Sequence, residues 1–61
     1  MPIVQIEMIE GRTLEQKRNL VKNVTAAICE SVDCPKENVS IIIREMSKEH
    51  SAKAGILKCD Q

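Results

Sequence analysis

Apolar residues near the start of the chain recur at every second position, as in a β-strand. A strand over residues 2–9 would carry apolar side chains on both faces: Val4, Ile6 and Met8 on one, Ile3 and Ile9 on the other. Strands that are apolar on both faces are usually covered on both sides. We therefore expect this strand to be covered on both faces, and we expect Glu10–Gly11–Arg12 to form the turn that ends it.

A helical pattern follows this turn. Thr13 fits a helix N-cap, and Gln16 three residues later completes a capping box. Apolar residues then form one stripe at helical spacing: Leu14, Leu20, Val21, Val24, Ala27, Ile28 and Val32. Polar residues are assigned to the opposite face: Glu15, Lys17, Arg18, Lys22, Asn23 and Glu30. Because Pro35 disfavours helix in the residue before it, we expect the helix to end near residues 32–33.

A second strand is predicted over residues 39–46, where the run Ile41–Ile42–Ile43 is β-branched and apolar on both faces. Strand, long helix and strand make one βαβ unit with parallel strands and a right-handed crossover. Residues 47–51 favour a helical turn, and residues 55–57 a short strand or arm. We expect the last few residues to be frayed. The fold class is α/β, with a short C-terminal arm.

The size of the chain predicts an oligomer. Residues 1–61 form a single domain, and a domain this small buries only about 60% of its unfolded surface. Disulfides, metals or oligomerisation usually compensate. The three cysteines are odd in number and lack CxxC spacing, which argues against a disulfide framework and a zinc site. Two strands and one helix cannot cover both faces of the sheet, so subunits are expected to meet there.

Composition argues against two classes of partner. Nine basic residues balance nine acidic ones, which disfavours a nucleic-acid or membrane-surface footprint. The chain has no Phe, Tyr or Trp on which bases could stack. No apolar run approaches the roughly 20 residues of a membrane span, and no signal-peptide pattern is present. Reduced cysteines complete the expectation of a cytoplasmic protein.

Two residues have chemistry suited to a catalytic site. Pro2 follows the initiator methionine, and a small second residue permits methionine removal. The proline nitrogen would then be a free secondary amine. Burial in an apolar pocket disfavours the protonated form and would lower the pKa of this amine towards neutral pH. Arg12 lies where a guanidinium could hold a carboxylate through two hydrogen bonds. The alternatives are a proline that only protects the N-terminus and a solvated turn arginine.

Several of these features together resemble the tautomerase family, of which 4-oxalocrotonate tautomerase is the type. They are Pro2, the stretch Ile9–Thr13, the helix start Glu15–Lys17, Pro35 and the strand over residues 39–46. The resemblance covers residues 2 to about 50. It implies a hexamer built as a trimer of dimers. Pro2 would be general base and then general acid, and no metal or organic cofactor would be needed. Arg12 of a neighbouring subunit would bind the carboxylate of a small 2-oxo or 2-hydroxy unsaturated acid.

The chain departs from the type enzyme at two substrate-binding positions. Ser40 stands where the type has a second arginine, and Ser51 where it has a pocket phenylalanine. Arg44 shares a strand face with Ser40, but four residues of strand span about 13 Å, which makes a simple replacement doubtful. The other candidate cations are Lys48, His50 and Lys53. Loss of a charged donor at an oxyanion lowers the catalytic rate on the order of 100-fold. We therefore expect that the protein either has weak activity on the substrate of the type enzyme or prefers a different substrate.

Two other functions stay open at this point. The same proline also serves hydrolytic dehalogenation and decarboxylation within the superfamily, where an added carboxylate activates water. Glu7 and Glu45 are the candidates for that carboxylate. The other possibility is a non-catalytic oligomeric module. If Met1 stays in place, the Pro2 nitrogen is a tertiary amide and cannot act as a base.

Overall fold

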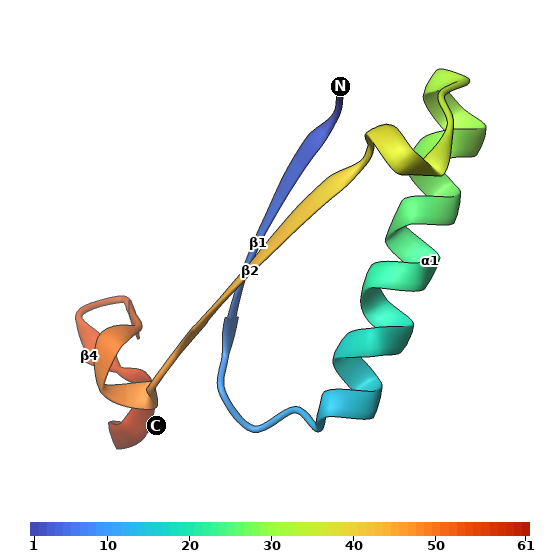
Figure 1. Ribbon diagram of the computed structural model, residues 1–61. Helices are drawn as coiled ribbons and strands as arrows, with labels where there is room; N and C mark the ends of the chain where they lie inside the picture. Colours follow the sequence, from blue (N-terminus) through green and yellow to red (C-terminus); the bar gives the residue numbers. More distant parts are fainter.

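A parallel two-stranded sheet and one long helix make up most of the computed structural model, which describes all residues 1–61 (Figure 1). Strand β1 covers Ile3–Ile9, helix α1 covers Leu14–Val32, and strand β2 covers Ser40–Met46. The strands pair in parallel, from Ile3 beside Ser40 to Ile9 beside Met46. This confirms the predicted βαβ unit, with each strand beginning one residue later than expected.

Helix α1 begins and ends as its sequence predicts. The Thr13 hydroxyl accepts a hydrogen bond from the Gln16 backbone N–H at 3.1 Å, and the Gln16 side-chain oxygen accepts one from the Thr13 N–H at 2.9 Å. Both bonds satisfy donors that a bare helix end leaves without partners. At the other end, Asp33 adopts a left-handed conformation (φ 55°, ψ 59°) directly after Val32. A helix commonly stops at such a residue.

The face of the sheet towards α1 is the better covered one. Half-buried apolar side chains alternate along both strands, and others lie on α1: Val4, Ile6, Met8, Ile41, Ile43, Leu20, Val21, Val24 and Ile28. The prediction that Lys17 lies on the polar face of the helix is wrong. Its side chain is only 27% exposed and pairs with Glu45 of β2 at 2.5 Å. The residue lies three positions after Leu14 and four before Val21, so it shares their stripe.

The opposite face of the sheet is uncovered. Ile3 is 65% exposed and Ile42 is 42% exposed, and no residue of the chain is fully buried. The radius of gyration is 14.5 Å, whereas a compact chain of this length would have about 10.5 Å. The accessible surface is 4886 Å², against about 4000 Å² for a folded monomer of this mass. The single chain therefore has no closed hydrophobic core.

The C-terminal arm lies at the end of the sheet away from the N-terminus (Figure 1). A 3-10 turn over Lys48–His50 leads into strands β3 (Ala52–Lys53) and β4 (Ile56–Leu57), which pair antiparallel. This confirms the predicted helical turn and arm. The expected frayed end is wrong. Lys58–Asp60 form another 3-10 turn, and the Gln61 amide donates to the Ile56 carbonyl oxygen at 3.3 Å. No helix in the chain has the length and apolar character needed to cross a bilayer.

Candidate active site

Pro2 lies at the head of the sheet, directly before β1. It is half-buried, and its carbonyl oxygen accepts a hydrogen bond from the Ser40 backbone N–H at 3.0 Å. The pairing therefore brings two of the predicted site residues, Pro2 and Ser40, side by side. Met1 is 87% exposed. Loss of Met1 would therefore disturb little packing and would leave the proline nitrogen at the edge of the sheet.

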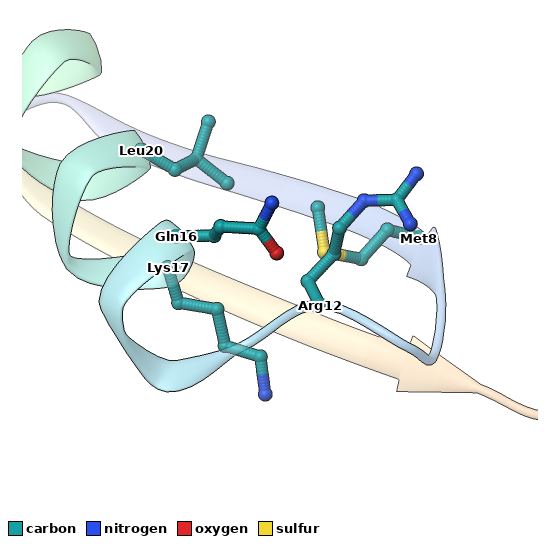
Figure 2. A pocket seen from close by; sticks show the side chains of 5 residues that line it. All are labelled: Met8, Arg12, Gln16, Lys17 and Leu20. Atoms are coloured by element: carbon teal, nitrogen blue, oxygen red, sulfur yellow. The ribbon is translucent and has the colours of Figure 1, made fainter.

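Arg12 lies beyond the other end of β1. Gly11 precedes it with φ 122°, a conformation that side-chain-bearing residues rarely adopt. Arg12 lines a cavity of about 240 Å³ between the end of β1 and the first turns of α1, together with Met8, Gln16, Lys17 and Leu20 (Figure 2). Lys17 is paired with Glu45, whereas the Arg12 guanidinium joins neither ion pair of the chain. Arg12 is thus the free cation of this cavity.

Ser51 belongs to a second cavity of about 200 Å³ beside the C-terminal arm. The side chains around it are Ile9, Ala52, Lys53, Lys58 and Gln61. The Ser51 carbonyl oxygen accepts a hydrogen bond from the Lys58 backbone N–H at 2.8 Å, which links the start of the arm to its end. Lys53, one of the cations considered for the missing arginine, is therefore beside Ser51. Lys58 could not be predicted as a neighbour of Ser51 from the sequence, because only the fold of the arm brings the two residues together.

The site residues fall into two groups at opposite ends of one subunit. Six residue steps from Ile3 to Ile9 cover about 20 Å of strand, with Pro2 before this span and Arg12 after it. No arginine side chain bridges that length. Within a single chain, the candidate residues Pro2 and Ser40 therefore lie at one end of β1, and Arg12 and Ser51 lie at the other end.

The carboxylates considered for water activation lie away from the proline of their own chain. Glu45 is held by Lys17 near the end of β2. Glu7 is five residues after Pro2, about 17 Å along the strand, and pairs in register with Arg44. Arg44 shares the uncovered face with Ser40 at the predicted spacing, which leaves Ser40 without this cation. No group of three or more His, Cys, Asp or Glu side chains is arranged to hold a metal ion.

A parallel βαβ chain with proline at position 2, separated by its first strand from a free arginine, has the plan of a small tautomerase subunit. The chain belongs to the tautomerase family, since the family model described as "Tautomerase enzyme" matches residues 2–60. It is 51% identical over 55 residues to the 2-hydroxymuconate tautomerase of Bacillus subtilis, covering 90% of this chain and 89% of that one.

The fold of the chain is similar to solved structures of 4-oxalocrotonate tautomerases and their homologues. The crystal structure of YwhB, a homologue of 4-oxalocrotonate tautomerase, has a TM-score of 0.95 and 47% identity, with 98% of both chains covered. A heterohexamer 4-oxalocrotonate tautomerase from Chloroflexus aurantiacus has a TM-score of 0.94 and 35% identity, with 98% of this chain and 97% of that chain covered. Tautomerases are isomerases, and the chain is an enzyme of this class.

Proposed function

We propose that the chain forms a hexamer, a trimer of dimers, that interconverts enol and keto forms of small unsaturated 2-hydroxy and 2-oxo carboxylic acids. The observation that carries the proposal is the distance between Pro2 and Arg12 within one subunit. A site that uses both residues must draw them from different chains. The heterohexamer from Chloroflexus aurantiacus and the 2-hydroxymuconate tautomerase of Bacillus subtilis support the assembly and the substrate class.

The uncovered sheet face supports the assembly. The chain exposes about 900 Å² more than a compact monomer of its mass would, given its 4886 Å² of surface. This excess is close to the roughly 800 Å² that each partner contributes to a standard interface. Ile3 and Ile42 lie on that face, so association would remove apolar area from water. We propose that sheets of neighbouring subunits meet there.

The proposed reaction moves one proton. With Met1 removed, the Pro2 nitrogen takes the proton of the substrate's enol hydroxyl, and the electron pair of that O–H bond forms the carbonyl. The shifted π electrons then accept the proton from the protonated amine at carbon. General acid–base transfer of this kind contributes roughly 10²- to 10⁴-fold. Because the proline returns to its starting state, the proposal requires no metal or organic cofactor.

The other site residues position the substrate. Arg12 from a neighbouring subunit would hold a substrate carboxylate through two parallel hydrogen bonds, since its guanidinium is not engaged in its own chain. Ser40 beside Pro2 would donate one uncharged hydrogen bond to the developing oxyanion. Ser51 would line the pocket as a small polar residue. The cytoplasm is the proposed compartment, because all three cysteines are free, as in a reducing environment.

The test is the initial rate of 2-hydroxymuconate ketonisation by protein whose intact mass confirms loss of Met1. The comparison is a variant with one lysine inserted between Met1 and Pro2, which keeps the Pro2 nitrogen in a tertiary amide. We expect turnover only with the free proline. Equal rates would overturn the proline mechanism. No rate in either protein, with Met1 confirmed absent, would favour another substrate class or a non-catalytic module.

Ser40→Arg should raise the rate on 2-hydroxymuconate. Removing a charged donor at an oxyanion lowers the rate on the order of 100-fold. Because the new arginine lacks the contacts that would position it, we expect kcat/KM to rise only about tenfold. Ser40→Gln provides an uncharged control of intermediate length. If both variants change the rate equally, charge at this position is not what limits the reaction.

A further inference from the structure

The C-terminal end of α1 holds two thiols that the proposed tautomerase site does not use. Cys29 lies near the end of the helix, and Cys34 lies two residues beyond its last residue, Val32. Both side chains are half-buried and neither forms a disulfide, whereas Cys59 is exposed. The chain therefore has one cysteine pair and one separate cysteine.

The left-handed residue Asp33 turns the chain back over the helix (φ 55°, ψ 59°). Cys34 follows this turn directly, five positions after Cys29. Both cysteines line the same cavity, of about 590 Å³, on the side of α1. The fold thus brings the two thiols to one cavity.

Two lysines, Lys22 and Lys36, line the cavity with the thiols. The thiolate is the reactive form of cysteine, and the surroundings of each thiol set its reactivity. Cys59 has a different setting, because its sulfur lies 3.8 Å from the Asp60 carboxylate.

We propose that Cys29 and Cys34 are a redox-active pair that closes to an intrachain disulfide when the protein meets a peroxide. The Cys34 thiolate attacks one peroxide oxygen, the O–O bond breaks, and a sulfenic acid and hydroxide form. The Cys29 sulfur then displaces the sulfenic oxygen as water, giving the S–S bond. Two thiols are oxidised, one hydrogen peroxide is reduced, and two waters are released. This inference is independent of the proposed tautomerase function.

The two thiols have different parts in this sequence. Partial burial raises the pKa of Cys29, and the neighbouring Cys34 and the Glu37 carboxylate raise it further. A raised pKa keeps Cys29 protonated at neutral pH, which suits it to the second step as the resolving thiol. Because the Cys29 thiolate fraction grows as pH rises towards that pKa, disulfide closure should become faster in alkaline buffer.

The experiment treats the reduced protein with hydrogen peroxide, blocks the remaining thiols by alkylation and measures intact mass. Wild type and Cys59→Ser should each lose two titratable thiols and the mass of two hydrogens, without forming linked chains. Cys29→Ser and Cys34→Ser should lose this reaction. Glu30 lies between the two cysteines, so cleavage after glutamate should give two peptides that separate only on reduction.

A second measurement keeps the proposal testable if peroxide reacts slowly. Phenylarsine oxide bridges two neighbouring thiols with loss of water, and it should form one adduct per chain in wild type and Cys59→Ser. Neither single variant of the pair should retain the adduct against a monothiol competitor. Oxidation that first links Cys59 between chains, or that converts Cys29 and Cys34 to separate sulfinic acids without a crosslink, would overturn the proposal.

Discussion

Two nearly inactive variants, Pro2→Ala and Arg12→Gln, are expected to regain activity when their subunits are combined in one assembly. Pro2→Ala should lower kcat/KM at least about 100-fold, because the cyclic secondary amine is the proposed base. Arg12→Gln should lower it about 10- to 100-fold through the lost charged hydrogen bonds. Since β1, about 20 Å long, separates the two residues in one chain, a working site needs one intact residue from each of two subunits.

The size of the recovery follows from random mixing. When equal amounts of the variants are unfolded and refolded together, half of the subunits have an intact Pro2 and the other half an intact Arg12. About a quarter of the sites then pair two intact residues, and the rate should approach about a quarter of the wild-type rate. The measurement is ketonisation by the refolded mixture, compared with each parent refolded alone.

A matched control separates complementation from general stabilisation. Pro2→Ala subunits mixed with the double variant Pro2→Ala, Arg12→Gln contain no intact proline, so this mixture should not exceed the rate of the first parent. If the two single variants recover nothing although mass measurements show mixed assemblies, the active proline and arginine do not come from different chains. That result would remove the observation on which the proposed function rests.

Local sequence signals were sufficient for most of the fold. The Thr13–Gln16 capping box needs only four neighbouring residues, and Pro35 acts on the residue before it, so both ends of α1 could be predicted. The alternation over residues 2–9 also depends only on near neighbours. These signals imply that β1 separates Pro2 from Arg12, so the distance between the two candidate residues could be predicted from the sequence.

Contacts between distant segments were harder to predict. Lys17 was assigned by its charge to the solvent face, although its partner Glu45 lies 28 residues away and meets it only through the strand pairing. The neighbourhood of Pro2 and Ser40 likewise depends on the parallel register. The thiol pair requires Asp33 to adopt a left-handed conformation, which aspartate visits only occasionally. Family resemblance helped with Ser40, but it offered nothing on the cysteines.

Ile42→Lys is expected to abolish both assembly and activity. Ile42 lies in the middle of β2 on the uncovered face and is 42% exposed in the single chain. Full burial of an isoleucine side chain contributes about 1.5–3 kcal/mol, and an unpaired lysine buried there would add a desolvation cost of several kcal/mol. Symmetry repeats this loss at every copy of the interface, and the single chain has no closed core with which to compensate.

The measurements are sedimentation velocity, far-ultraviolet circular dichroism and ketonisation rate on the same sample. Val32→Lys is the control, because Val32 is another exposed apolar residue, at 58%, but lies in the last turn of α1. A lysine at the C-terminal end of a helix interacts favourably with the helix dipole, so this variant should remain assembled and active. Smaller particles, lost helix signal and lost turnover should appear together in Ile42→Lys. An assembled and active Ile42→Lys protein would show that subunits do not meet on this face of the sheet, whereas a monomeric, active wild type would refute the assembly itself.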